Sequence, residues 1–278
     1  MFIALALGST VLYGTFRFVI GRYSRRLPIW TIVLVSNGAA ALVYVVVGVA
    51  RGDLVFVGAD VLPGVMGGVL NLGAVILSLQ AMRRGKLGVV TGITAMRVLV
   101  PLVFSFVIGE AISIVTAVGI VIMLIGLVLF ASRSSPISDG TRGSSSFVLF
   151  ALGAAVMGGL ATVVLDLGSR ANIAGTLTMN QVTEVLIVGV VMAVTRAPLA
   201  ADRRAITSLA GAGVALALGN TAFFTASGIG DIGIAAVLAA LAPLVTAALA
   251  WILLKEHLNR SEIGALVVIL FGTGLVLA

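Results

Sequence analysis

The stretch Gly233–Leu258, GIAAVLAALAPLVTAALAWILLKEHL, decides the fold class of this protein. No charged side chain stands between Gly233 and Leu254, and the pair Lys255–Glu256 follows at once. A helix that crosses the apolar core of a bilayer needs roughly 20 consecutive, mostly apolar residues. The stretch therefore predicts a membrane-spanning helix that ends in a short polar connection.

The composition of the whole chain agrees with a membrane environment. The 278 residues are 60% hydrophobic and 10% charged, whereas soluble domains carry about 25% charged residues. We therefore expect a multi-pass membrane protein, placed in the plasma membrane (a bacterial-type inner membrane), with the lipid bilayer as its main partner. The chain has no cysteine and a single histidine, His257, so we expect no disulfide, no metal site and no cofactor.

Ten apolar segments are long enough to be spans. They cover residues 2–20, 30–49, 60–81, 88–108, 112–131, 146–167, 177–195, 206–226, 232–254 and 262–278. The longest connection, rich in Ser, Gly and Pro, is typical of a flexible linker. The predicted organisation is thus a first five-helix unit at 1–131, a linker at 132–146 and a second five-helix unit at 147–278.

The two halves repeat weakly. Gly14 precedes Gly159 by 145 residues, and Gly126 precedes Gly272 by 146 residues. Because five is an odd number of crossings, the second copy must enter the membrane upside down. Inverted repeats are the architecture of alternating-access carriers.

Positive charges alternate between the connections. The connections after the odd-numbered segments hold 13 Lys and Arg residues, and those after the even-numbered segments hold only Arg51 and Arg170. This distribution sets membrane orientation, so a nucleic-acid partner is not expected. The positive-inside rule places the basic connections in the cytoplasm and both termini outside.

The closing segments, together with GALVVILFGTGLVL at 264–277, resemble the last repeat of the drug/metabolite transporter superfamily, EamA type. The shared marks are an Ala-rich helix with Pro243, the stretch from Ala250 to Leu254, Glu256, and a Gly-spaced final helix. The first half echoes them at FVIGE (106–110) and GIVIMLIGLVLF (119–130), and LYGTF (12–16) is similar to the Trp-Gly element of that family.

The resemblance covers the whole chain and implies a carrier of small organic metabolites, amino-acid-like or drug-like, most often an exporter, with a central cavity between the halves. Arg97 departs from the pattern, because it stands where the second repeat has Pro243. The resemblance also implies cytoplasmic termini, opposite to the charge distribution, so the orientation stays open at this stage. The oligomeric state also stays open between a monomer and a homodimer.

Two charges lie deep inside predicted spans. A charge at the bilayer centre costs roughly 2.5–3.5 kcal/mol on insertion scales, and such residues usually serve function. Arg97 is expected to bind an anionic group and Glu184 a proton or a cationic group; the alternative is a structural ion pair between them. Thr94 and Gln181 stand one turn before these charges and are expected to line the same pockets.

Uncharged polar and aromatic side chains complete the candidate substrate site. Amides inside spans can bond a substrate or hold helices together, and aromatic rings can stack on a substrate or pack. These candidates are Asn37, Asn71, Asn220, Tyr13 and Trp251. Arg17 lies near the basic end of the first segment and is expected to reach the lipid headgroups.

The tetrad GIGD (228–231) is similar to the motif of intramembrane aspartyl proteases. A protease needs a second carboxylate near Asp231, and Asp166 is better explained as an i,i+4 partner of Arg170. The repeat instead predicts a turn, with Asp231 at the start of a helix. No Walker motif is present, so we expect no ATP site. We favour a secondary transporter, driven by a proton or substrate gradient, over an enzyme; the alternatives are the protease and a non-transporting membrane scaffold.

Overall fold

The computed structural model describes residues 1–24, 26–52, 58–84, 93–94, 96–109, 113–133, 146–199, 201–254 and 260–277. Within these ranges every regular element is a helix. The elements are α1 (Phe2–Ser24), α2 (Ile29–Arg51), α3 (Gly58–Arg84), the 3₁₀ helix η1 (Met96–Val98), α5 (Leu99–Val107), α6 (Ile114–Arg133), α7 (Ser146–Thr195), α8 (Arg203–Ile229), α9 (Ile232–Ala239), α10 (Ala242–Leu254) and α11 (Arg260–Leu277).

The helices have the length and the apolar surface of membrane spans. Six candidate spans are found in the described residues, the first two being Phe2–Tyr23 and Ile29–Ala50. Their exposed side chains are largely aliphatic, such as Leu42 and Val46 on α2, which are 64% and 57% exposed. An aliphatic outer surface is stable only in lipid. The prediction of an all-helical membrane fold is confirmed at this level.

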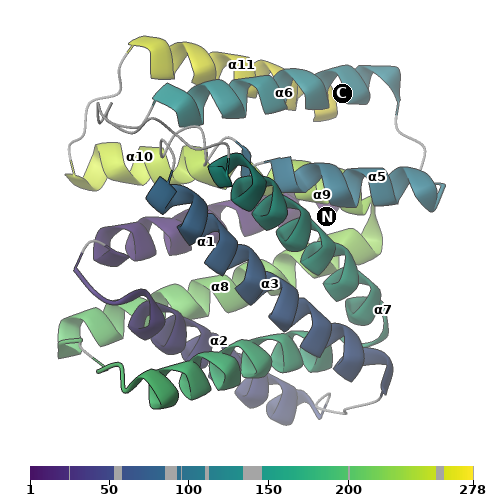
Figure 1. The fold of residues 1–278 in the computed structure, drawn as a ribbon. Coiled ribbons are helices and arrows are strands. Elements are labelled where there is room, and N and C mark those ends of the chain that lie inside the picture. Colours follow the sequence, from purple (N-terminus) through teal and green to yellow (C-terminus); the bar gives the residue numbers. More distant parts are fainter. Residues whose placement is uncertain are drawn as a thin grey trace.

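The predicted segments 146–167 and 177–195 both lie in α7, which spans 50 residues. They are two helices that meet at a kink, where Asn172 has a non-helical backbone (φ −154°, ψ 108°). At 1.5 Å per residue a straight helix of that length would measure about 75 Å, which far exceeds a bilayer core of about 30 Å. Figure 1 shows how α7 solves this problem: it bends sharply and its second part turns back across the molecule.

The structure differs from the predicted segments by a break inside the span 232–254. α9 ends at Ala239, and α10 begins at Ala242 after a turn at Ala240 and Leu241. The proline at position 243 has no N–H for the carbonyl of Ala239, four residues earlier, so the helix must end there.

The predicted span 88–108 is interrupted in a similar way. Residues 85–92 and 95 lie outside the described residues, and η1 at Met96–Val98 precedes α5. Pro101 has no N–H for the carbonyl of Arg97, which accounts for the tighter 3₁₀ turn at this point.

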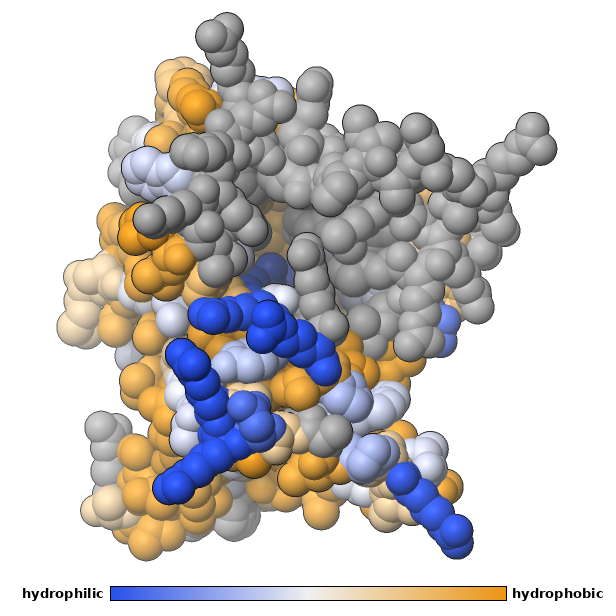
Figure 2. Space-filling model, turned by 90° about the vertical axis from the view of Figure 1, so that its left-hand side faces the viewer, coloured by the Kyte–Doolittle hydropathy of each residue, from blue (hydrophilic) through white to orange (hydrophobic). Residues whose placement is uncertain are grey.

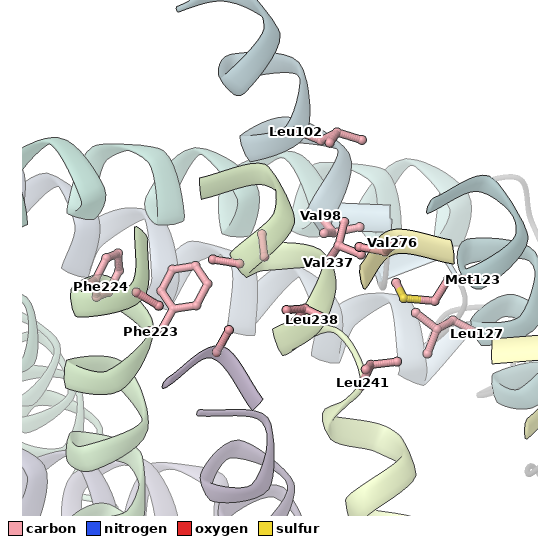
Figure 3. Packing of buried hydrophobic residues seen from close by; sticks show 14 of the residues in the cluster. Val98, Leu102, Met123, Leu127, Phe223, Phe224, Val237, Leu238, Leu241 and Val276 are labelled. Carbon is pink, nitrogen blue, oxygen red and sulfur yellow. The ribbon is translucent and has the colours of Figure 1, made fainter. Parts of the chain in front are cut away.

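Helices from the two halves of the chain pack against each other. The most extensive contacts are between α3 and α7, α6 and α11, and α1 and α8. Figure 1 shows α6 and α11 side by side at one edge, and α1, α2, α8 and the second part of α7 in the body of the molecule. One buried apolar cluster joins both halves; it includes Val98 and Leu102 from the first half and Val237 and Leu238 from the second (Figure 3).

Two close helix crossings use glycines that are 145 residues apart. A Cβ at Gly14 would lie 2.8 Å from the carbonyl oxygen of Ala242 and against the side chain of Val245. A Cβ at Gly159 would lie 2.6 Å from the carbonyl oxygen of Arg97 and 2.5 Å from Cβ of Val100. Ala242 and Val245 follow Arg97 and Val100 by the same 145 residues. The α1–α10 crossing and the crossing of α7 with η1 and α5 therefore involve residues with the same spacing of 145 positions.

The two ends of the helices differ in their charge. In Figure 1 the α1–α2 turn and the α7–α8 connection lie at the left, whereas the bend of α7 and the α8–α9 junction lie at the right. Figure 2 views the left end and shows long hydrophilic side chains gathered there. The exposed arginines of the described connections at this end, which we call the basic end, are Arg22, Arg26, Arg196, Arg203 and Arg204.

Candidate functional site

Glu184 lies at the centre of a polar cluster between the two halves. Its side chain on α7 is 7% exposed. Oε2 accepts a hydrogen bond of 2.5 Å from Nδ2 of Asn37 on α2, and Oε1 accepts one of 3.4 Å from Nδ2 of Asn180. The side chain of Asn71 on α3 also lies close enough to interact with this carboxyl group. The predicted residues Glu184, Asn37 and Asn71 are thus brought together.

Asn180 was not among the predicted site residues. It stands four residues before Glu184, so both side chains lie on the same face of α7, and its Oδ1 accepts a 3.5 Å hydrogen bond from Nδ2 of Asn71. The spacing was the signal in the sequence that could have identified it. Because a buried carboxylate is costly unless hydrogen-bonded, these amides are what allows Glu184 to remain inside the protein.

Polar oxygens near the bend of α7 have unused hydrogen-bonding capacity. Gln181 is 2% exposed, and its Oε1 has no hydrogen-bond partner among the described residues. The same holds for the hydroxyl oxygens of Ser169, Thr176 and Thr178. Buried polar atoms are nearly always paired in folded proteins. This part of α7 can therefore accept hydrogen bonds from a solute or from water.

A second polar group extends the site toward α1 and α8. The hydroxyl of Tyr13 donates a 2.8 Å hydrogen bond to Oδ1 of Asn220, and the hydroxyl of Tyr44 on α2 donates a 3.0 Å hydrogen bond to the carbonyl of Ala217. The side chain of Tyr44 also interacts with Asn220 and, electrostatically, with Glu184. The predicted residues Tyr13 and Asn220 are therefore linked to the Glu184 cluster through Tyr44, which sequence reasoning missed.

Arg97 lies apart from Glu184. Its side chain on η1 is exposed, and among the described residues the one ion pair is Arg170–Asp166, at 3.0 Å. The interpretation of Arg97 and Glu184 as a structural ion pair is therefore wrong. Arg97 instead interacts electrostatically with Tyr13. Its side chain also lies near Gly158 of α7, where an added Cβ would be 3.6 Å from Cδ of Arg97.

The remaining predicted residues differ in their surroundings. Thr94 is half-buried in the short helical stretch before η1. Trp251 is 55% exposed on α10, and nothing in the described part of the chain joins it to the polar groups above. A large aromatic ring with this exposure on an outer helix suits contact with lipid better than contact with a solute.

Asp231 caps a helix. Its Oδ1 accepts hydrogen bonds from the backbone N–H of Ile234, at 3.0 Å, and from the hydroxyl of Ser105, at 2.8 Å. These contacts confirm the predicted position at a helix start, and the predicted pair of Asp166 with Arg170 is also present. Nothing among the described residues therefore supports a protease. Glu110 and Glu256 lie outside the described residues.

The sequence matches the EamA-like transporter family over residues 1–132 and 145–278. The chain belongs to the EamA-like transporter family. Membership in this family indicates a membrane transporter of small solutes. The two matched ranges correspond closely to the two predicted five-helix units.

The fold of this EamA-like chain recurs among solved structures, of which 29 chains match. One, described only as a crystal structure of a protein, superposes with a TM-score of 0.84 at 15% sequence identity, over 99% of this chain and 95% of its own. No curated protein sequence matches significantly. At 15% identity the likeness extends to the fold alone.

Proposed function

We propose that this EamA-like protein is a secondary transporter that exports small organic metabolites by alternating access. Ten crossings would form two inverted five-helix units, residues 1–131 and 147–278, joined by the linker at 132–146. Rocking of one unit against the other would expose a central site to each side in turn. Glu184 would bind a proton or the cationic group of the solute, and Arg97 an anionic group.

The packing of equivalent helices supports the inverted arrangement. Inversion requires that each helix run antiparallel to its repeat partner where the two touch. Gly126 of α6 lies against Ile269 of α11, whereas Gly119, earlier in α6, lies against Leu275, later in α11. Along α2 and α7, Asn37 bonds to Glu184 and Thr31 bonds to the carbonyl of Pro198, again in opposite directions.

The observation that carries the proposal is the position of Glu184 between the units. Its carboxyl group belongs to the second unit, and two of its amide partners, Asn37 and Asn71, belong to the first. A proton or an ammonium group that binds this carboxylate must compete with those amides. Binding at Glu184 would therefore change the contact between the two units that have to move.

The transport test begins with identification of an exported metabolite. Metabolite profiles of the medium are compared between cells with and without the protein, and the enriched solute is then followed in proteoliposomes with and without a pH gradient. We expect Glu184→Gln to abolish the response to the gradient and Arg97→Ala to lower the flux at least about tenfold. Arg203→Gln, at the basic end, is the matched control and should transport normally.

Two results would contradict the proposal at different levels. Unchanged flux in both Glu184→Gln and Arg97→Ala would remove these residues from the site. The absence of flux for every enriched metabolite in reconstituted wild-type protein would favour a non-transporting scaffold.

A further inference from the structure

Gln181 has a buried side-chain oxygen that accepts no hydrogen bond in the part of the chain that the structure describes. The side chain is 2% exposed, and Oε1 is the atom without a partner. An amide oxygen can only accept, and leaving it unpaired inside a protein costs free energy. Because the side chain is enclosed, a donor that reaches Oε1 without opening the protein must come from a neighbouring side chain.

The polar neighbours of Gln181 on its own helix are Thr178 and Glu184, each three residues away. Residues at this spacing lie next to each other on a helix, so their side chains can hydrogen-bond. The positions four residues away, Leu177 and Val185, are apolar. Of the two polar neighbours, Glu184 is the one whose role changes with pH, since a carboxyl group gains a donor when it is protonated.

The hydrogen bonds around Glu184 suit its ionised form. Both oxygens accept from amide nitrogens: Oε2 from Nδ2 of Asn37, and Oε1 from Nδ2 of Asn180. A carboxylate has acceptor sites only, so it has no hydrogen to offer Gln181. A protonated carboxyl group has an O–H that needs an acceptor, and the two Nδ2 atoms cannot accept.

Other ionisable side chains are kept away from this carboxyl group. The hydroxyl of Tyr44, on the packed face of α2, donates to the carbonyl of Ala217. Arg97 lies beside Gly158 in the first part of α7. The charged residues of α2, α3 and α8 stand in the first or last turn of each helix, whereas the amides of α2 and α3 lie well inside; these charged residues are Arg51, Asp60, Arg83, Arg84, Arg203 and Arg204.

We propose that Gln181 is the acceptor for the proton of Glu184, and that the two residues form a proton switch between the units. When a proton from solution binds the carboxylate, the new O–H donates to Oε1 of Gln181 in the same helix. The bonds from Asn37 and Asn180 weaken, because they lose the negative charge that strengthens them. Since the bond from Asn37 joins the two units, proton binding exchanges a bond between units for a bond within α7. Gln181 thus positions the proton, and this role rests on the proposed function of Glu184.

Infrared titration of the purified protein measures this switch without transport. The carbonyl band of protonated Glu184 is the band that Glu184→Gln removes, and its pH midpoint is compared between variants. Gln181→Met keeps the side-chain length but removes the amide acceptor, so we expect a midpoint lowered by about one pH unit, or about tenfold weaker proton binding. Asn37→Leu removes a donor to the ionised form and should raise the midpoint.

Thermal unfolding separates this role from a purely structural one. Above the midpoint Oε1 of Gln181 has no donor to lose, so Gln181→Met should be at least as stable as the wild type. Below the midpoint the variant lacks a hydrogen bond and should unfold several degrees earlier. Thr178→Val removes the hydroxyl of the other polar neighbour and should leave the infrared midpoint unchanged.

Four results would overturn the proposal. They are the absence of a band that Glu184→Gln removes, a midpoint that Gln181→Met leaves unchanged or raises, an equal loss of stability on both sides of the midpoint, and a midpoint lowered as much by Thr178→Val as by Gln181→Met.

These outcomes are distinguishable from a failure of the proposed function. A protein whose Glu184 titrates with a midpoint set by Gln181, but which moves no solute across proteoliposomes, would retain the proton switch and lose the transporter assignment. Transport that responds to a pH gradient through Glu184, with a midpoint independent of Gln181, would do the reverse.

Discussion

At the scale of single residues, Glu184 depends on a small number of amide donors. Asn180 donates to Oε1 and also accepts from Asn71, so Asn180→Leu removes a donor while keeping the side-chain size. A buried polar group that loses its partner costs about 1–3 kcal/mol. We expect a thermal unfolding midpoint lowered by several degrees in detergent. Leu186→Ala, on the exposed face of the same helix, should have a much smaller effect, and equal losses would contradict the role of Asn180.

Tyr13 gives a second residue-level prediction. Tyr13→Phe keeps the ring packed near Phe223, 6.5 Å away, and removes only the hydroxyl that bonds to Asn220. The expected cost is about 1 kcal/mol of unfolding free energy, measured by chemical denaturation. A loss of solute flux larger than this change in stability would place the hydroxyl at the substrate. Unchanged stability would mean that the bond to Asn220 contributes nothing.

The polar residues that the structure brings together are found in the sequence where a polar group interrupts an apolar run. Glu184, Asn37 and Asn71 are recognisable for that reason, since burial of a polar group in a span requires a purpose. Asn180 lies near the predicted start of its segment, where a polar residue needs no explanation.

At the scale of helices, the equivalent crossings at Gly14 and Gly159 make a paired prediction. A methyl group at either glycine would meet the backbone or side chain of the crossing helix at less than 3 Å. We therefore expect Gly14→Ala and Gly159→Ala each to reduce the yield of folded protein several-fold in size-exclusion chromatography. An effect at one crossing only would argue against their equivalence.

The matched controls for this pair lie on the same two helices. Gly8→Ala on α1 and Gly189→Ala on α7 add a methyl group where nothing lies within 4 Å. Alanine is favoured over glycine in a helix by about 1 kcal/mol, so both variants should be as stable as the wild type or more stable.

Helix positions followed from apolar runs, but helix continuity did not. The run of residues 168–176, GSRANIAGT, suggested a connection between two spans, and the kink at Asn172 that separates the two helices of α7 lies within it. The run 232–254, by contrast, is uniformly apolar but breaks into α9 and α10. Hydropathy reports the environment of a segment, whereas continuity depends on individual backbone hydrogen bonds such as the one that Pro243 cannot donate.

At the scale of the whole molecule, described contacts join the two halves at both ends. At the basic end Tyr23 bonds to Ser208 and Thr31 to the carbonyl of Pro198, and a separate set of contacts lies at the opposite end.

Ser105 of α5 donates to Asp231, the cap of α9, and a Cβ at Gly233 would lie 3.1 Å from Leu102. In an alternating-access cycle these contacts must separate. We therefore expect Ser105→Ala to favour opening at this end by about fivefold, as the loss of one hydrogen bond of about 1 kcal/mol predicts.

Labelling with a membrane-impermeant maleimide measures this opening. The reporter is Leu102→Cys, a 9% exposed position, labelled from the side opposite to the basic end, with and without Ser105→Ala. Ser36→Ala is the control, because within the described ranges the Ser36 hydroxyl bonds to the carbonyl of Ile32 in its own helix. If Leu102→Cys is labelled equally fast in the Ser105→Ala and Ser36→Ala backgrounds, the bond between Ser105 and Asp231 does not keep the end opposite to the basic end closed.

The orientation of the whole molecule follows from the positions of its ends and charges. Figure 1 labels both termini toward the side that carries the α8–α9 junction, away from the basic end. Since basic connections remain in the cytoplasm, both termini should lie outside, contrary to the expectation from the family resemblance.

Alkaline phosphatase fused after residue 278 should be active, and green fluorescent protein at the same point should be dark. The same reporters inserted between α7 and α8, after Leu199, should give the reverse result. A fluorescent C-terminal fusion would place the basic end outside, and the positive-inside rule would then fail for this protein.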